Sequence, residues 1–550
     1  MFRGVLKIIG KTLLLLFIVM IIGGTSSGAG AEVQEDALPE EEKVTFQIRE
    51  FSIEGNTLLD DSEIERAISI YKGKNKTDED VERARSDLES LYHRKGYPTV
   101  LVNIPEQTVE KGVIRIEVIE SRIGTVTITG NEYVTKKKIL RQLSGFHPGA
   151  ILYMPTVQEQ LGRISSNPDL QVKPVLIPTR ELDIIDVELK VQDRLPVHGS
   201  FELNNRSTHT TPDLRTTASL RYDNLWQQDH SLAVQYQTSP EEPDEVQSVY
   251  ISYVLSPPWD YRQGMAFYHI KSDSETTTAG DIQVLGKGRI TGFRYLIPFP
   301  ASERCQHTAS LGIDYKDFDE TIGFKNNDNN LKTPIQYAPL FLSYSASLPD
   351  SHGSTTLSTS FNMVFRGLLT EQKEFEAKRY QAKGNYLFLT AKAERSSKLP
   401  GDAGLLLRLD GQLANQPLIS NEQYPAGGVD NLRGYKESEE LGDNAIHFTL
   451  EMQSPNLFQR LGFRKAGNLT LHAFYDGAIL QVLDRLSEDS EGSTVKSKNA
   501  GITLQGVGAG LRGGIGNHFK YGFDWGVALN DTDLTEKGDT RMYFNLLYQF

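Results

Sequence analysis

The sequence is poor in cysteine and in basic residues. Cys305 is the only cysteine among 550 residues, which excludes a disulfide within the chain and a cysteine-rich metal site. The 58 Lys and Arg are outnumbered by 72 Asp and Glu, giving a formal net charge of −14, which disfavours a general nucleic-acid binder. The 11 His are scattered, and no HExxH, P-loop or GxSxG motif occurs in a suitable context. We therefore expect no enzyme activity, no cofactor and no metal site.

Long hydrophobic runs are also missing beyond the N-terminus. Residues 13–22 (LLLLFIVMII) are apolar, but this run is short for a spanning helix of about 20 residues. A short basic region precedes the run, and Ala29-Gly30-Ala31 follows it as a small-residue cleavage site. Residues 1–31 are therefore predicted to be a signal peptide, with cleavage before Glu32. The alternative is an uncleaved membrane anchor.

An internal repeat follows an acidic, flexible lead-in at residues 32–44. Residues 51–64 (FSIEGNTLLDDSEI) and 126–139 (VTITGNEYVTKKKI) each contain an alternating strand, a Gly-Asn turn and the start of a helix. Each copy continues with a second helix and two strands, expected near 77–95, 99–104 and 113–119 in the first copy and near 156–165, 172–176 and 183–191 in the second. The sequence thus predicts two small α+β domains of β-α-α-β-β order, over residues 45–121 and 122–193.

Hydrophobic spacing supports the long helix of the first copy. Val81, Ala84, Leu88 and Leu91 recur at helical intervals within residues 77–95. One face of this helix is therefore expected to cover the sheet of its domain.

Residues 194–550 show a different pattern, in which apolar and polar residues alternate in segments of about ten residues. Residues 230–238 and 404–413 are examples. About 16 antiparallel strands of a transmembrane barrel would fit into this region. The low mean hydropathy of −0.38 agrees with a barrel, because half of each spanning strand faces a polar lumen. A soluble β-sandwich is the alternative, which the signal peptide and the end of the chain disfavour.

The chain ends in a strand with one continuous apolar face. Residues 541–550 (RMYFNLLYQF) alternate strictly, and hydrocarbon requires this of a lipid-facing strand because it cannot hydrate polar side chains. The apolar face consists of Met542, Phe544, Leu546, Tyr548 and Phe550.

The repeat and the barrel together resemble a known family. The Ile53-Glu54-Gly55-Asn56 opening and the Lys95-Gly96-Tyr97 helix exit are similar to those of POTRA domains. Two such domains before a barrel resemble the two-partner secretion transporters of the haemolysin-activator type. This resemblance implies an outer-membrane barrel with periplasmic POTRA domains, which capture an unfolded passenger that the barrel then conducts.

The same resemblance implies several partners. A large secreted exoprotein, of the haemolysin or adhesin kind, would be the passenger. The barrel-assembly machinery and periplasmic chaperones would act during biogenesis, and outer-membrane lipid would surround the barrel. The terminal Phe550 resembles the signal that the assembly machinery reads.

A local motif at Leu432-Arg433-Gly434-Tyr435 resembles the VRGF/Y motif of this family. In the family, that motif lies at the tip of a long loop between the eleventh and twelfth strands, folded back into the lumen. The resemblance implies that Arg433 holds this loop by pairing with a carboxylate of the barrel wall. Its guanidinium is permanently charged and planar, which suits a carboxylate.

The implied partner lies in a strand that matches the family's F-x-D-x-G pattern at Phe474 and Asp476. Alternation places both side chains toward the lumen, since a carboxylate facing lipid would be costly. The match departs at the end, where Gly477 comes one place early and Ala478 occupies the glycine position. The alternative is that Arg433 and Asp476 lie in unrelated surface loops.

A glycine-rich run lies further along the same region. Gly506-Val507-Gly508-Ala509-Gly510 falls within an alternating segment. Its glycines are therefore assigned to close strand packing or a turn, not to a nucleotide loop.

Two other functions remain open. An insertase of the same superfamily would use the same loop motif, and a passive porin would need no POTRA domains. The lead-in also departs from the family pattern, because it lacks an apolar helical stripe. We therefore expect that no plug helix precedes the first domain.

Deletion of residues 32–44 should leave the conductance of the reconstituted barrel nearly unchanged, because a segment without an apolar helical face cannot pack in the pore. Single-channel recording in planar bilayers measures this. A large rise in conductance would show that the segment obstructs the pore.

Overall fold

The computed structural model describes residues 45–550 apart from several short gaps, and it divides the chain into two compact units, Met1–Ser121 and Arg122–Phe550. The gaps are at residues 110, 166, 261, 275, 280–281, 301, 303, 320, 325–326, 368, 370, 464–466 and 489–494. The predicted signal peptide and the lead-in lie outside the described residues. No helix in the described part of the chain is long and apolar enough to cross a membrane.

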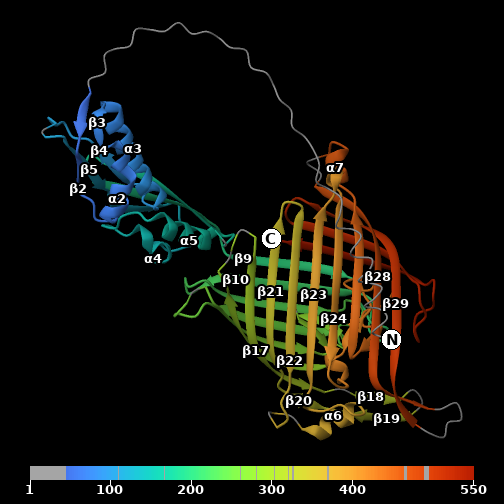
Figure 1. Cartoon of the computed structure of the whole chain (residues 1–550). Helices are drawn as coiled ribbons and strands as arrows, with labels where there is room; N and C mark the ends of the chain where they lie inside the picture. Colours follow the sequence, from blue (N-terminus) through green and yellow to red (C-terminus); the bar gives the residue numbers. More distant parts are fainter. Residues whose placement is uncertain are drawn as a thin grey trace. The chain divides into compact units, whose positions relative to one another are not determined.

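The first unit is a small α+β domain (Figure 1). Strands β2, β5 and β4 form one sheet in that order, with β2 parallel and β4 antiparallel to β5. Helices α2 and α3 cover this sheet, and β1 pairs separately with β3. The elements are β1 (Phe46–Ile48), β2 (Glu50–Glu54), α2 (Asp61–Ile68), η2 (Ser69–Tyr71), β3 (Gly73–Lys76), α3 (Asp78–Arg94), β4 (Val100–Asn103) and β5 (Val113–Glu120).

The Gly-Asn turn of the first unit has a physical reason for both residues. Gly55 has a φ of 85°, and a Cβ at this position would lie 2.3 Å from the carbonyl oxygen of Val118. The Asn56 amide donates to the carbonyl of Leu59 at 2.8 Å, and its oxygen accepts from the Tyr92 hydroxyl at 2.7 Å. The turn that follows β2 is therefore held against strand β5 by Gly55 and against helix α3 by Asn56.

Residues 122–193 repeat this arrangement at the start of the second unit. Strands β6, β8 and β7 form a sheet in that order, with β6 parallel and β7 antiparallel to β8. Gly130 has a φ of 84°, and its Cβ would lie 2.4 Å from the carbonyl oxygen of Val191. The elements are β6 (Arg122–Thr129), α4 (Lys136–Gln142), η3 (Ser144–Phe146), α5 (Met154–Ser165), β7 (Leu170–Pro178) and β8 (Ile184–Asp193).

The remainder of the second unit is a closed antiparallel barrel of 16 strands, in which β20 and β21 count as one because both pair with β17. The strands are β9 (Val197–Asn204), β10 (Arg215–Leu225), β11 (His230–Thr238), β12 (Gln247–Leu255), β13 (Gly264–Ser272), β16 (Gly288–Pro298), β17 (Gln306–Phe318), β20 (Ile335–Tyr337), β21 (Leu340–Asp350), β22 (Gly353–Met363), β23 (Leu387–Lys398), β24 (Gly404–Ala414), β27 (Asn444–Gln453), β28 (Asn468–Glu488), β29 (Val495–Ile515), β30 (Phe519–Ala528) and β31 (Thr540–Gln549).

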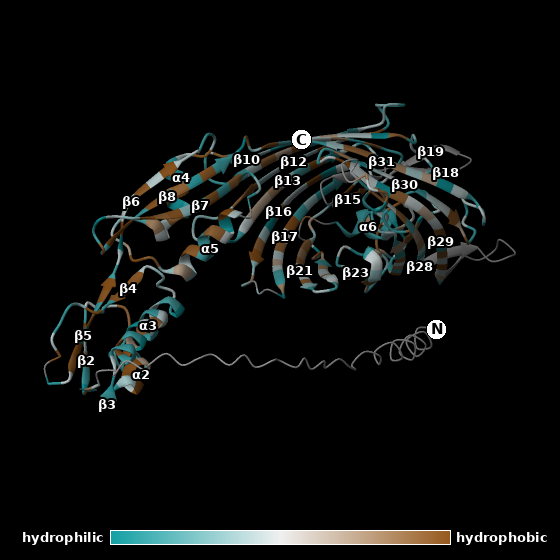
Figure 2. Ribbon diagram, turned by 90° about the horizontal axis from the view of Figure 1, so that it is seen from above, coloured by the Kyte–Doolittle hydropathy of each residue, from teal (hydrophilic) through white to brown (hydrophobic). Residues whose placement is uncertain are grey.

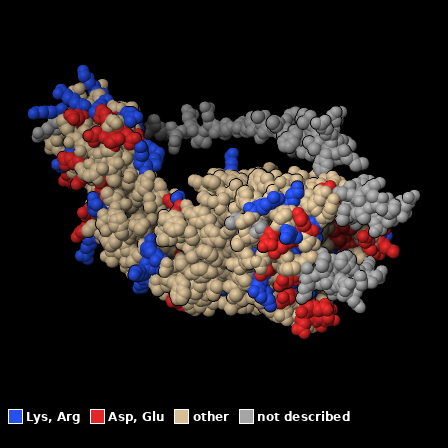
Figure 3. Space-filling model, turned by 90° about the horizontal axis from the view of Figure 1, so that it is seen from below, with Lys and Arg blue, Asp and Glu red and all other residues tan. Residues whose placement is uncertain are grey.

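The outer wall of the barrel has the surface that lipid requires. Hydrophilic and hydrophobic residues alternate along its strands (Figure 2), and the wall presents a broad area largely free of charged side chains (Figure 3). Apolar side chains are exposed on neighbouring strands of the barrel, for example Leu407 and Leu409 on β24 and Leu450 on β27. The fold is therefore the predicted one, periplasmic-type α+β structure followed by a transmembrane barrel.

The two ends of the barrel differ in the length of their connections. Turns at one end are mostly short, such as residues 226–229 and 351–352, whereas the other end carries long loops at 273–287, 319–339, 364–386 and 415–443. Short turns of such barrels face the periplasm and long loops face the exterior. The long loops contain β14 (Thr276–Ala279), β15 (Ile282–Leu285), β18 (Thr321–Phe324), β19 (Asn327–Lys332), α6 (Gln372–Lys378), η5 (Ser420–Glu422), β25 (Tyr424–Ala426) and β26 (Glu440–Gly442), and the opposite end carries η4 (Pro400–Asp402) and α7 (Leu457–Arg460).

Strands β28 and β29 are longer than the sequence pattern indicates. Each has 21 residues, whereas alternation is visible only at 468–476 and 503–512. Lipid imposes alternation within the hydrocarbon layer only. Beyond that layer the hairpin keeps its backbone pairing without the pattern.

The barrel closes where its first and last strands meet. Strands β9 and β31 share five register pairs, against eleven between β22 and β23. Phe550 extends the seam, because its backbone N–H donates to the carbonyl of Gly199 at 3.0 Å and its main-chain oxygen accepts from the Gly199 N–H at 3.2 Å. A Cβ on Gly199 would lie 2.3 Å from the Phe550 ring. The terminal ring therefore packs directly on the backbone of the first strand.

Deletion of Phe550 should lower the amount of assembled barrel, because it removes two backbone hydrogen bonds and an apolar contact from the shortest pairing in the sheet. The folded fraction in outer-membrane preparations, measured by heat-modifiable gel mobility, gives the result. Met542→Ala is the control, since Met542 is also exposed on β31 but lies away from the chain end. Equal assembly of the Phe550 deletion and the control would contradict the prediction.

Candidate functional site in the barrel lumen

The loop at residues 415–443 folds back into the barrel. Its strands β25 and β26 pair as a hairpin, and the side chains of Leu432, Arg433 and Tyr435 at its tip are buried. Gly427 and Gly434 have φ values of 119° and 110°, which favour glycine. A Cβ on Gly427 would lie 2.2 Å from the carbonyl oxygen of Lys436. Glycine therefore permits the tight reversal that presents Arg433.

Arg433 binds the barrel wall through every part of its guanidinium group. Its Nε and Nη2 atoms donate to the two carboxylate oxygens of Asp476 at 2.8 and 3.0 Å, and its backbone amide donates to the same carboxylate at 3.2 Å. Its Nη1 donates to Glu451 at 2.8 Å and to Asp524 at 3.3 Å. The Phe474 ring lies 3.4 Å from the guanidinium carbon. Arg433 of the loop therefore lies against Phe474 and Asp476 of the wall strand β28.

The surrounding charges form a network of three carboxylates and two arginines. Arg512 donates to both oxygens of Glu451 at 2.8 and 3.1 Å, and His472 hydrogen-bonds Asp524. Burial by itself would lower the pKa of Arg433, but Asp476 and Glu451 outweigh this effect and raise its pKa. The guanidinium therefore stays charged, and the network holds it by ionic hydrogen bonds.

Tyrosines of the loop and the wall fix the residues next to Arg433. The Gly434 amide donates to the hydroxyl of Tyr543 at 2.8 Å, and that hydroxyl donates to the carbonyl of Tyr435 at 2.6 Å. The Tyr435 hydroxyl in turn contacts the carbonyls of Asn530 and Gln505 at 2.9 and 3.1 Å. The tip is therefore held from β29, the end of β30 and β31 at once.

Glycines in the wall make room for the loop. A Cβ on Gly506 of β29 would lie 1.9 Å from the carbonyl oxygen of Arg433, and one on Gly526 of β30 would lie 2.6 Å from the amide nitrogen of Gly434. Gly508 similarly leaves space for the Phe474 ring, at 2.5 Å. Gly506 thus allows a close approach of the loop backbone, which the sequence did not predict. The predicted close strand packing holds at Gly508 and Gly510, where a Cβ would lie 2.0 and 2.4 Å from carbonyl oxygens of β30.

The early glycine of the wall motif has a separate explanation. A Cβ on Gly477 would lie 2.4 Å from the ring of Phe448, an outward-facing residue of β27. Ala478 faces the opposite side and is buried. Gly477 therefore accommodates an aromatic side chain on the lipid side, and the departure from the family pattern leaves the position of Asp476 intact.

Sequence reasoning missed several members of the network, namely Glu451, His472, Arg512, Asp524 and Tyr543. A signal for some of them was present. Glu451 lies between the exposed residues Leu450 and Met452, and Asp524 lies between the exposed residues Phe523 and Trp525. A carboxylate within an outward apolar alternation must face the lumen.

A cavity of about 450 Å³ lies beside the loop tip. Basic and acidic side chains both line it, including Arg206, Arg408 and Lys520 opposite Asp430 and Glu451. Because charges of both signs line the cavity, it shows no preference for one sign of charge. Phe550 lies apart from this site, at the seam.

One group in the described part of the chain has the geometry of a metal site. Potential ligand atoms of Asp169, His198 and Asp223 lie within 4.8 Å of one another. Both carboxylates already have cationic partners, because Arg194 lies 2.6 Å from Asp169 and Arg221 lies 2.9 Å from Asp223. The group is therefore an ion-pair network between the 122–193 segment and the first strands of the barrel.

Gly506→Ala should displace the loop tip from the wall, because the added methyl group overlaps the carbonyl of Arg433. We expect a higher and noisier conductance of the reconstituted barrel in planar bilayers. Gly522→Ala is the matched control, since its Cβ would meet only the Arg512 side chain, at 3.9 Å. Equal conductance of the two variants would show that close contact with Gly506 does not hold the loop.

Comparisons with known proteins agree with this architecture. A POTRA domain model of the ShlB type matches residues 46–121, and the model described as haemolysin secretion/activation protein ShlB/FhaC/HecB matches residues 184–513. The outer membrane transporter CdiB of Dickeya dadantii is 21% identical over 472 residues, covering 84% of this chain and 80% of that protein. The heme/hemopexin transporter protein HuxB of Haemophilus influenzae is 19% identical over 469 residues, covering 82% and 77%.

Solved structures share the fold. CdiB from Escherichia coli superposes with a TM-score of 0.63 at 18% identity, covering 100% of this chain and 98% of that one. BamA from Haemophilus ducreyi lacking POTRA domains 1–3 superposes with a TM-score of 0.53 at 15% identity, covering 92% and 100%. At these identities the likeness concerns the fold alone.

Proposed function

Because the chain belongs to the family of haemolysin secretion/activation proteins ShlB/FhaC/HecB, we propose that it exports its passenger through the barrel, past the Arg433 loop. Members of this family are outer-membrane transporters of two-partner secretion, with POTRA domains in the periplasm and a secreted exoprotein as partner. The passenger of this chain would be a large exoprotein of the haemolysin or adhesin kind.

Residues 122–193 would form a second POTRA domain. Support comes from the sheet order and strand directions, which are those of residues 46–121, and from the same glycine-over-carbonyl contact in the opening turn. Both sheets end in edge strands, β2 and β4 in one and β6 and β7 in the other. An extended passenger segment would add to such an edge by main-chain hydrogen bonds.

The observation that carries the transport mechanism is the bidentate contact between Arg433 and Asp476 inside the lumen. A loop held in this way occupies space that a passenger must use. Withdrawing Arg433 would leave Asp476, Glu451 and Asp524 without their shared cation, and breaking a buried ion pair costs about 3–5 kcal/mol. The loop would therefore move only when an entering chain offers compensating contacts. Folding of the passenger outside would then favour outward movement.

Biogenesis would involve further partners. The barrel-assembly machinery and periplasmic chaperones would recognise the unfolded chain, with Phe550 as part of the signal. Its place at the seam, next to Gly199, supports a role in the last step of closure.

Arg433→Ala should strongly reduce secretion of the cognate passenger while the barrel still assembles, because the loop loses its wall contacts. Co-expression with a candidate exoprotein, followed by immunoblotting of the medium, measures secretion. Arg433→Lys should also be impaired, since an ammonium group cannot make the bidentate contact. Arg289→Ala is the control, because Arg289 is an exposed arginine of β16.

Normal secretion by Arg433→Ala would overturn the role of the pair. If no candidate exoprotein reaches the medium and other outer-membrane barrels instead fail to insert when the chain is depleted, the protein is an insertase of the same superfamily. Both readouts need the assembled barrel, which heat-modifiable gel mobility confirms.

A further inference from the structure

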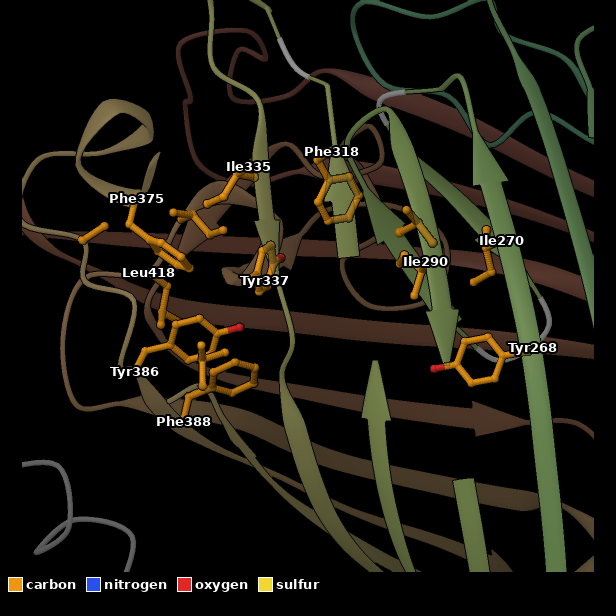
Figure 4. Close-up of a cluster of buried hydrophobic side chains, with 14 residues drawn as sticks. Tyr268, Ile270, Ile290, Phe318, Ile335, Tyr337, Phe375, Tyr386, Phe388 and Leu418 are labelled. Carbon is orange, nitrogen blue, oxygen red and sulfur yellow. The ribbon is translucent and has the colours of Figure 1, made fainter. Parts of the chain in front are cut away.

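The exterior end of the barrel contains an apolar cluster where a polar opening would be expected. Lumen-facing residues of transmembrane barrels are polar as a rule, yet Ile270, Ile290, Phe318 and Phe388 are buried together at the ends of four strands. Residues of strand β20 and of the loops complete the cluster (Figure 4), among them Ile335, Tyr337, Phe375, Tyr386 and Leu418. The long loops therefore pack into the outer mouth and do not extend freely from it.

Helix α6 supplies the central side chain of this cluster. Phe375 is fully buried, with its ring centroid 5.6 Å from that of Tyr337 and 6.2 Å from that of Tyr386. Lys373 and Glu376, on the same helix, are exposed. The helix thus covers the cluster with one face and presents the other face to solvent.

A buried ion pair fastens the end of this helix. Arg379 donates to both carboxylate oxygens of Asp443, at 2.5 and 2.7 Å, and to the carbonyls of Leu418 and Leu483. Asp443 has no exposed surface and also accepts from the backbone amides of Leu418 and Leu483 at 2.8 and 2.7 Å. One arginine therefore joins the α6 segment to the start and the end of the 415–443 loop and to strand β28.

A second polar contact lies on the other side of the cluster. Glu422 in η5 accepts from Lys316 of β17 and from the Tyr337 hydroxyl, both at 2.6 Å. The loop that carries Arg433 is therefore held at its tip by Asp476 and near its base by Arg379, Lys316 and Tyr337.

We propose that residues 371–386 form an extracellular lid, with Arg379 as the positioning residue that latches it to Asp443. The lid closes the outer mouth through the Phe375 cluster, as a barrier separate from the Arg433 contact deeper in the lumen. Because Asp443 ends the loop that carries Arg433, release of the latch frees the lid and removes one of the contacts that hold the base of that loop. Export through the lumen requires both barriers to open.

Arg379→Ala tests the lid in the full-length protein without any passenger. We expect a several-fold higher mean conductance and more frequent openings in planar bilayers, and greater sensitivity of expressing cells to vancomycin, which an intact outer membrane excludes. Lys373→Ala is the matched control, because Lys373 is an exposed cationic residue on the same helix. Arg379→Lys should give an intermediate conductance, since it keeps the charge but loses the bidentate geometry.

Wild-type conductance and vancomycin resistance in an assembled Arg379→Ala barrel would overturn the lid. If Arg379→Ala fails to give a heat-modifiable barrel, Phe375→Ala tests the lid instead, because it removes the central ring of the cluster and leaves the ion pair in place. Phe375→Ala should raise the conductance, and a wild-type value would likewise overturn the proposal. These measurements involve no exoprotein. The lid proposal can therefore be refuted while the secretion proposal stands, and the secretion proposal can be refuted while the lid proposal stands.

Discussion

The lumenal structure depends on one constraint, the cost of leaving a charge without a partner in a confined space. Arg433 brings a permanent positive charge to the barrel wall, and Asp476, Glu451 and Asp524 neutralise it there. Asp476 in particular would be a costly buried charge without the arginine, and the arginine would be costly without these carboxylates. Loop and wall therefore stabilise one another, and the position of the loop follows from the positions of three strands.

Such short contacts between the loop and the wall require wall positions without a side chain. Gly506 and Gly526 allow the backbone of residues 433–434 to lie against the strands, and Gly427 and Gly434 allow the loop to turn there. The charge network and the glycines thus depend on each other. Side chains at Gly506 or Gly526 would move the guanidinium away from Asp476.

The sequence reveals the parts of this protein whose patterns are local. Val81, Ala84 and Leu88 are buried on α3 as their spacing predicts, although Tyr92 and not Leu91 completes the buried face. The Gly-Asn turns, the alternating strands and the apolar face of β31 are local in the same way. Period-two alternation also places Phe474 and Asp476 on the lumenal side.

The remaining features depend on contacts between distant strands and loops. The grouping of Glu451, Arg512 and Asp524 around one guanidinium requires the register of four neighbouring strands, which no single strand encodes. Helix α6 buries only Phe375, so it carries no helical stripe that would predict a lid. Its partners Asp443 and Leu418 belong to another loop, and the contact is visible only in the folded barrel.

The order of residues along the chain gives the loop a particular place in assembly. The partners of Arg433 and Gly434 on the wall follow them by 43, 91 and 109 residues, at Asp476, Asp524 and Tyr543. Contacts at such separation form late, because the intervening chain must first be ordered. The full set of contacts at the loop tip can therefore form only after the last strand, which carries Tyr543, has joined the sheet. Docking of Arg433 itself requires the strands up to β30, so the loop can enter the lumen only late in the assembly of the barrel.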